Sequence, residues 1–279
     1  DLKSIENSST NEDLFEGPSQ WMPHGRVFGG QVLAQSLVAA TRTIDAREVH
    51  SMHGYFLRPG DINLPITFSV DRLRDGRSFS TRRVQAFQKD EAIFSMIASF
   101  QEHDPGLDHQ DEFPTGIPDP ESLPSAADLI GDNPHPVAQY WSKARPFDMR
   151  HVPSPIYFKV EGEPVAHQAV WLRSLGKLPD SQALHTAALA YASDYSILES
   201  IYRRHGIAWS HPGLKSASLD HAMWFHRPAR VDEWMLYVQE SPSAQGGRGL
   251  SLGKIFSREG LLLATVAQEG MIRVPEVAN

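Results

Sequence analysis

One carboxylate in the second half of the chain lies where a helical pattern predicts apolar contacts. At about 100° per residue, the helix-face neighbours of Asp194 are Ala187, Ala190, Tyr191, Ile197, Leu198 and Ile201. Burying a carboxylate costs several kcal/mol unless it is hydrogen bonded or protonated, and carboxyl groups perturbed in this way are common among catalytic acids and bases. We therefore predict that Asp194 is a general base. The alternative is a structural Asp held by backbone donors or by an arginine.

Two polar residues in otherwise apolar strands could complete such a site. Gln268 closes the apolar run 261–267, and Ser218 opens the strand that leads into 220–225. An amide and a hydroxyl beside a carboxylate can hold a water molecule while the carboxylate removes its proton. Taken alone, Gln268 is better explained as a strand end that faces solvent, and Ser218 as a loop residue.

Other chemistries lack their motifs in this chain. It contains no cysteine, which excludes disulfides, thiolate metal sites and cysteine nucleophiles. No His-Glu-x-x-His pair occurs. Gly29 and Gly30 lack the further glycine of a dinucleotide fingerprint, and we interpret them as a close approach of a helix start to a strand. We expect neither a metal nor a cofactor.

Composition and charge narrow the class of protein further. The chain has 279 residues, 41% of them hydrophobic and 22% charged, with a formal net charge of −8. This balance argues against a nucleic-acid partner. No apolar run approaches the roughly 18–20 residues that span a bilayer, and the ends at 1–11 and 274–279 carry no recognisable targeting motif. We therefore expect a soluble, cytoplasmic protein.

The elements that must position these residues occur twice. Three short anchors recur in the same order and at a nearly constant offset, which indicates an internal repeat. The pairs are 56–59 with 225–228, 76–77 with 247–248, and 97–102 with 264–269. Each half is predicted to be one long helix followed by four strands, with a further strand before the helix. The predicted elements are 28–44, 49–57, 66–71, 77–88 and 92–101, then 184–203, 216–226, 233–240, 248–256 and 261–271.

A long helix wrapped by an antiparallel sheet is the layout of the hotdog fold, so the repeat predicts an α+β double hotdog. We place the N-terminal unit at 1–103, a proline-rich acidic linker at 104–150 and the C-terminal unit at 151–279. Proline denies donors to a sheet ladder, and the linker is expected to hold only one short helix, near 126–130. The first helix carries no Asp or Glu between 29 and 44. We therefore expect one catalytic site per chain.

Longer runs of residues resemble a known family, the acyl-CoA thioesterase II (TesB) family. The resemblance covers about residues 15–273 apart from the linker, and it implies hydrolysis of acyl-CoA to a free fatty acid and CoA. It also implies a homo-oligomer, a dimer or a tetramer of double-hotdog chains. The runs that carry it are 27–31, 53–60, 191–194, 219–228 and 268–270.

The resemblance assigns catalytic roles to the residues already singled out. In the family an Asp, a Gln and a Thr activate a water molecule, and these fall on Asp194, Gln268 and Ser218. Serine keeps the hydroxyl but lacks the methyl group that restricts the threonine rotamer. We expect retained activity with a less firmly positioned water.

Substrate contacts are expected from both halves. Backbone N–H groups around Gly29, Gly30 and Gln31, at the start of the first helix, could polarise the thioester carbonyl. Arg58 is a candidate for the CoA phosphates, and Tyr191 for the wall of the acyl site. Other arginines near the anchors could also receive phosphates: Arg82, Arg83, Arg227 and Arg248.

Two rival functions stay open at this point. Hotdog folds also host hydratases and dehydratases of enoyl- or hydroxyacyl-CoA, because fold alone does not determine chemistry. Those reactions often use a histidine, and His53 and His221 lie outside the Asp194 helix. The other rival is a non-catalytic acyl-CoA-binding protein, which would need an inert carboxylate at position 194.

Overall fold

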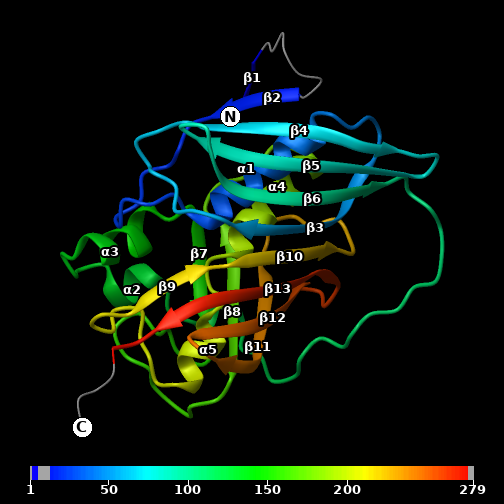
Figure 1. The fold of residues 1–279 in the computed structure, drawn as a ribbon. Coiled ribbons are helices and arrows are strands. Elements are labelled where there is room, and N and C mark those ends of the chain that lie inside the picture. The colour runs from blue at the N-terminus through cyan, green and yellow to red at the C-terminus, as the bar shows by residue number, and fades with distance from the viewer. Residues whose placement is uncertain (1, 6–12, 276–279) are drawn as a thin grey trace. The chain divides into compact units, whose positions relative to one another are not determined.

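The computed structural model describes residues 2–5 and 13–275 of the chain (Figure 1). Parts of the two chain ends in which no targeting motif was found lie outside the described residues, namely 1, 6–12 and 276–279. The chain divides into two compact units, each assembled from three segments. The first unit is Asp1–Gln110, Leu178–Tyr195 and Ala222–Ala229, and the second is Asp111–Lys177, Ser196–His221 and Arg230–Asn279. This division groups segments in space, whereas the boundaries at 103 and 150 describe sequence repeats and stay a prediction.

The first unit is an antiparallel sheet packed against two helices. Helix α1 (Gly29–Thr41) buries Leu33, Leu37 and Ala40 and contacts strands β3 to β6 and helix α4 (Gln182–Ser193). The strand order is β1-β2-β4-β5-β6-β3, and residues 222–225 of β10 lie next to β3 (Figure 1). The strands are β1 (Lys3–Ile5), β2 (Asp13–Gly17), β3 (Glu48–Phe56), β4 (Ile66–Asp75), β5 (Phe79–Gln88) and β6 (Glu91–Gln101). The predicted helix followed by four strands is confirmed, with β2 as the strand before it.

The second unit repeats this plan with a shorter helix. Helix α5 (Glu199–Arg204) contacts β8, β11 and β12, and the strand order is β7-β8-β11-β12-β13 with β9 paired to β13. The strands are β7 (Phe147–His151), β8 (His167–Ser174), β9 (Lys215–Ser218), β11 (Met235–Gln245), β12 (Arg248–Ser257) and β13 (Leu262–Arg273). Strand β10 (Asp220–Phe225) is divided between the units after His221.

Tight turns join hairpin strands in both units. Lys89 and Asp90 join β5 to β6 with φ values of 50° and 63°, the left-handed values of a two-residue hairpin turn. In the second unit Gly260 has a φ of 89°. Its N–H donates to the Ser257 carbonyl at 3.1 Å and closes the turn between β12 and β13. These turns fix the register of the strands on either side.

The long helix predicted at 184–203 is wrong in one respect, because it is interrupted at Asp194. Helix α4 ends at Ser193 with Asp194 as its C-cap, and α5 begins only at Glu199. The Tyr195 N–H donates to the Ala192 carbonyl, three residues earlier, at 3.2 Å. This spacing is that of a 3₁₀ turn, whereas a continuing α-helix would bond to the carbonyl four residues earlier. The Asp194 carboxylate accepts a hydrogen bond from another helix instead. Among the described residues, no helix has the length and apolar character needed to cross a membrane.

Three glycines seat the segment that follows this interruption onto the sheet of the second unit. A Cβ at Gly270 would lie 2.5 Å from the Leu198 side chain, and one at Gly249 would lie 2.6 Å from Ile201. At Gly253 the corresponding distance to Ile197 is 3.0 Å. Since real Cβ atoms do not approach so closely, the missing side chains admit residues 197–201 against β12 and β13.

The linker holds more structure than the prolines predict. Helix α2 (Ala126–Ile130) is the expected short helix, and Ser125 and Asp128 form a capping box at its start. Three further short elements follow or precede it: η1 (Pro120–Ser122), α3 (Pro136–Gln139) and η2 (Tyr140–Ala144). Strand β7 also begins at Phe147, inside the predicted linker. The Trp171 indole N–H donates to the Pro118 carbonyl at 2.9 Å, which ties the segment to β8.

Candidate active site

The predicted general base is held by the start of α1. The Gly30 N–H donates to Asp194 Oδ2 at 2.8 Å, so the first turn of one helix binds the carboxylate that ends the other. A Cβ at Gly29 would lie 2.6 Å from the same oxygen, and one at Gly30 would lie 2.2 Å from the Tyr191 carbonyl. The two glycines therefore allow a close approach to helix α4 and its C-cap, whereas the sequence predicted an approach to a strand. This hydrogen bond restrains the position of the carboxylate at the start of α1.

Three aromatic rings pack together in the first unit, at the start of α1 and the end of α4. Phe28 stacks on Tyr195 with ring centroids 4.7 Å apart and meets Tyr191 edge-on at 5.1 Å. The Tyr191 hydroxyl donates to Gln20 Oε1 at 2.6 Å and accepts from the Tyr195 hydroxyl at 3.2 Å. Asp194 itself is half-buried. The carboxylate is thus only partly exposed and belongs to a segment whose neighbouring side chains are aromatic.

Gln268 and Ser218 lie together in the second unit. Gln268 is 1% exposed, and its Nε2 donates to Ser218 Oγ at 2.9 Å. Its Oε1 accepts a hydrogen bond from Nδ1 of His221, which is also 1% exposed. The alternatives for Gln268 and Ser218, a strand end and a loop residue facing solvent, do not describe this buried hydrogen-bonded group.

A break in one predicted strand makes this group possible. The strand predicted at 216–226 is instead two strands, β9 and β10, separated at Leu219. In a continuous strand Ser218 and His221 would point to opposite faces, because they are three residues apart. The Leu219 N–H donates to the Glu269 carbonyl at 2.9 Å, and the Glu269 N–H donates to Asp220 Oδ1 at 2.8 Å. The interruption is thereby anchored to β13, and both side chains reach Gln268.

His221 is the member of this group that sequence reasoning did not place. Complete burial lowers the pKa of His221 to about 4, although its hydrogen bond to Gln268 acts in the opposite direction. The ring is therefore neutral at neutral pH. Its position in an apolar strand was visible in the sequence, but the odd spacing from Ser218 argued against a shared partner.

The substrate-binding predictions fare unevenly. The Gly30 N–H is engaged by Asp194, and the Gln31 N–H donates to the Phe28 carbonyl at 3.1 Å. The Gln31 side chain is 6% exposed and bonds to the Pro18 carbonyl at 2.8 Å, which is a structural role. A part for Gly29, Gly30 and Gln31 in polarising a carbonyl stays a prediction.

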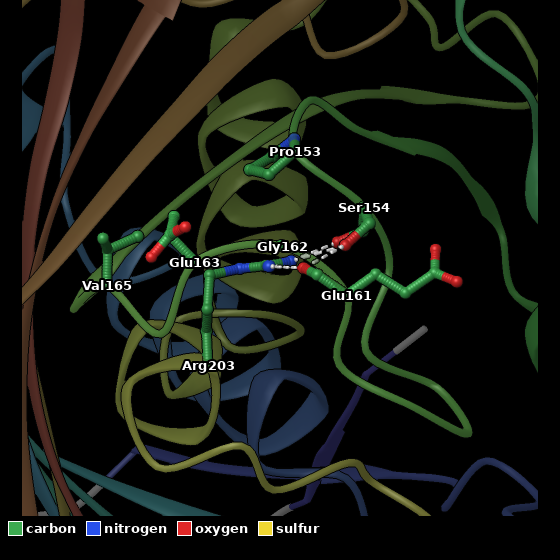
Figure 2. Close-up of a pocket in the computed structure, with 7 residues that line it drawn as sticks. All are labelled: Pro153, Ser154, Glu161, Gly162, Glu163, Val165 and Arg203. Carbon is green, nitrogen blue, oxygen red and sulfur yellow. Dashed lines mark hydrogen bonds between the residues drawn. The ribbon is translucent and has the colours of Figure 1, made fainter.

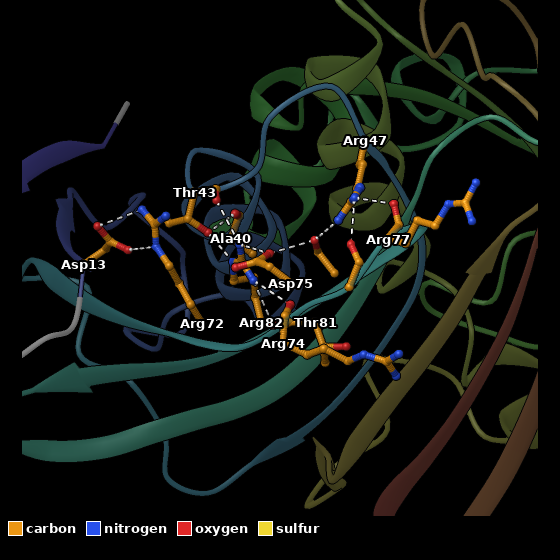
Figure 3. Close-up of polar contacts among 12 residues, drawn as sticks. Asp13, Ala40, Thr43, Arg47, Arg72, Arg74, Asp75, Arg77, Thr81 and Arg82 are labelled. Atoms are coloured by element: carbon orange, nitrogen blue, oxygen red, sulfur yellow. Dashed lines mark hydrogen bonds and ion pairs between the residues drawn. The ribbon is translucent and has the colours of Figure 1, made fainter.

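The arginines differ in how far they are available to a phosphate. Arg58 is half-exposed and bonds to the Ala92 carbonyl at 2.8 Å. Arg82 is 2% exposed, and its guanidinium is surrounded by Thr43, Asp75 and backbone carbonyls (Figure 3). Arg82 is therefore part of the core of the first unit. Surface ion pairs occupy the other candidates, which pair as Arg83–Asp71, Arg227–Asp108 and Arg248–Glu269.

Two cavities lie apart from these residues. One of about 260 Å³ in the second unit is lined by Pro153, Val165 and Arg203, whose guanidinium is bonded to Ser154 and to the Glu161 carbonyl (Figure 2). The other, of about 420 Å³, lies in the first unit where α1 ends and α4 begins. Because α1 and α4 meet near Asp194 at their opposite ends, this second cavity does not adjoin the candidate base.

Comparisons with known proteins show the family of this chain. A family model described as the acyl-CoA thioesterase N-terminal domain matches residues 17–101, and one described as acyl-CoA thioesterase matches 142–271. Human acyl-coenzyme A thioesterase 8 is 41% identical over 96% of this chain and 88% of its own length. Acyl-CoA thioesterase 2 of Haemophilus influenzae is 38% identical over 94% of this chain and 93% of its own.

A solved structure described as acyl-CoA thioesterase II TesB2 from Mycobacterium marinum is 44% identical. It covers 100% of this chain and 98% of its own, with a TM-score of 0.78. A dehydratase domain of the curacin polyketide synthase reaches a TM-score of 0.56 at 13% identity, which is a likeness of fold alone. The chain belongs to the acyl-CoA thioesterase family, in its thioesterase II (TesB) branch with the double-hotdog fold.

Proposed function

We propose that the protein hydrolyses acyl-CoA thioesters with a water molecule that Asp194 deprotonates and that Gln268 and Ser218 orient. The observation that carries this proposal is the Asp194 carboxylate, half-buried and held through Oδ2 by the Gly30 N–H. The hydrogen-bonded pair formed by buried Gln268 and partly buried Ser218 supports it, because an amide and a hydroxyl together can position a water. Membership of the thioesterase family supports the reaction class.

The proposed steps balance without a covalent enzyme intermediate. Asp194 takes one proton from the water molecule while the water oxygen attacks the thioester carbon. This attack forms a tetrahedral oxyanion. The C–S bond then breaks, and the CoA sulfur leaves and takes up the proton. A thiolate is a good leaving group, so an oriented water suffices. Trapping of an acyl-enzyme by hydroxylamine would contradict this route.

The decisive experiment is a thiol-release assay of the Asp194→Asn variant across acyl-CoA chain lengths. Asparagine keeps the size and the acceptor for Gly30 but cannot take a proton, so we expect turnover to fall by about 10²–10⁴-fold with an unchanged circular dichroism spectrum. Full activity in this variant would end the proposal. Following enoyl absorbance in the same reactions identifies a hydratase, and thermal stabilisation by CoA without thiol release identifies a binding protein.

The substrate contacts, the cellular location and the oligomeric state are part of the same proposal. Acyl-CoA is the substrate that the family implies, and the wall of the acyl site at Tyr191 and a phosphate contact at Arg58 stay predictions. So do the cytoplasmic location and the homo-oligomer, a dimer or a tetramer. Light scattering coupled to gel filtration measures the number of chains directly.

A further inference from the structure

The strongest unassigned feature is the histidine behind the amide of Gln268. His221 is 1% exposed, and its Nδ1 contacts an atom of the proposed site rather than solvent. A buried imidazole needs a hydrogen-bond partner, and here that partner is the side chain proposed to orient the attacking water. This inference rests on the proposed function of Gln268.

The contacts give the hydrogen-bond chain a direction. An amide oxygen only accepts, so the ring nitrogen that faces Gln268 Oε1 must carry a proton. With Oε1 held in this way, Gln268 turns its Nε2 toward Ser218 and donates to Oγ at 2.9 Å. A hydroxyl has one hydrogen, so Ser218 Oγ, once it accepts from Gln268, directs that hydrogen toward another acceptor.

We propose that His221 is a positioning residue: as the neutral Nδ1–H tautomer, it fixes the orientation of the Gln268 amide and thereby makes Ser218 a donor in the site. Without the imidazole, the amide of Gln268 could rotate by half a turn and exchange its oxygen and nitrogen. Ser218 would then donate to Gln268 instead of toward the reacting molecules. His221 acts through Gln268 and exchanges no proton with the substrate.

The test compares two replacements of His221 in the full chain by thiol release from the best acyl-CoA substrate. Phenylalanine keeps a ring but removes both nitrogens, and we expect H221F to lower kcat about tenfold with KM changed less than about twofold. Asparagine places an amide N–H near the position of Nδ1, so H221N should retain most of the activity. If H221F does not fold, H221Q replaces it, because its amide reaches the position of Nε2 instead. Wild-type kcat in the variants that lack the Nδ1 donor would overturn the proposal.

Variants of Gln268 separate this inference from the proposed site. If His221 acts through Gln268, H221F should cause no further loss in a Q268A background, whereas multiplying losses would contradict it. If Q268A alone keeps full activity, the proposed function of Gln268 fails, whatever His221 does. Nitrogen-15 spectra of the histidine ring at neutral pH give an independent readout. A proton on Nδ1 is expected, and one on Nε2 would overturn the stated direction.

Discussion

Ser218 is the residue at which this chain departs from the threonine that the family resemblance implies. Its Oγ accepts from Gln268 Nε2 at 2.9 Å, so its hydroxyl already has one fixed direction. A β-branched side chain would add rotamer restriction, but the hydrogen bond supplies part of the same restraint. The departure is therefore compatible with a working site.

Substitutions at Ser218 test the role of the hydroxyl. Ser218→Ala removes the acceptor for Gln268 and should lower kcat by about 10- to 100-fold. Ser218→Thr keeps the oxygen and restricts its rotamer, so kcat should match or exceed that of the wild type. Thiol-release kinetics measure both. Equal activity of all three proteins would show that the hydroxyl takes no part.

A methyl group at Gly29 should disturb the base directly. The added Cβ would lie 2.6 Å from Asp194 Oδ2 and 3.0 Å from the Phe56 ring. We expect Gly29→Ala to lower kcat and to cost about 1–3 kcal/mol of unfolding free energy. Gly106→Ala is the matched control, because a Cβ there meets nothing within 4 Å. Denaturant unfolding and thiol release measure the two effects, and identical behaviour of the variants would contradict the close approach.

Among the elements, α5 is anchored by the buried carboxylate of Glu199. Glu199 lies in the first turn of α5 and binds His151 Nε2 and Gln168 Nε2 at 2.9 Å each, and Trp209 Nε1 at 3.0 Å. Burial would raise the pKa of Glu199, but His151 and these hydrogen bonds outweigh it and hold the pKa below its usual 4.5. The same network ties α5 to β7 and β8.

The lowered pKa makes this anchor sensitive to acid. A carboxyl whose pKa falls on folding stabilises the folded state above its unfolded pKa and loses that contribution as the pH falls through the folded pKa. Glu199→Gln should therefore lower the unfolding free energy by about 1–3 kcal/mol near neutral pH. The difference from wild type should shrink below pH 4.5. Melting curves against pH measure it, with the exposed Glu163→Gln as control.

The elements also show how far a sequence can predict such a site. Apolar spacing located α1 and the strands and singled out Asp194 as a candidate, because periodicity reports which face is buried. It could not predict the ends of α4 and β9, where single hydrogen bonds to Asp194 and Glu269 override the periodic pattern. His221 was missed for the same reason, since strand alternation places it opposite Ser218. In the linker, prolines concealed elements that are held by contacts to Trp171 and Trp234.

At the scale of the whole molecule, the two units exchange segments of the chain. The first unit takes α4 from beyond residue 177, and α4 packs against α1. A sequence-continuous half therefore does not contain a complete unit. The internal repeat accounts for the similar order of elements in the two halves of the sequence. The compact units show which segments of the chain pack together.

Expression of separate halves tests this exchange. Residues 1–103 alone lack α4, so the face of α1 that packs on it would be left uncovered. We expect residues 1–103 and 151–279 each to lack a cooperative thermal transition when expressed alone, while the full chain melts cooperatively. Circular dichroism melting curves check this. A sharp transition in the isolated 1–103 fragment would contradict it.

The gap between β9 and β10 has a consequence for how this protein can vary. If residues 218–221 formed one continuous strand of the same length, His221 would turn to the face opposite Ser218. Imidazole and amide would then part, although each residue of the trio would still be present. The path of the chain at one connection, and not only residue identity, therefore decides whether the trio forms. A comparison of residue types alone would score a relative with a continuous strand here as intact.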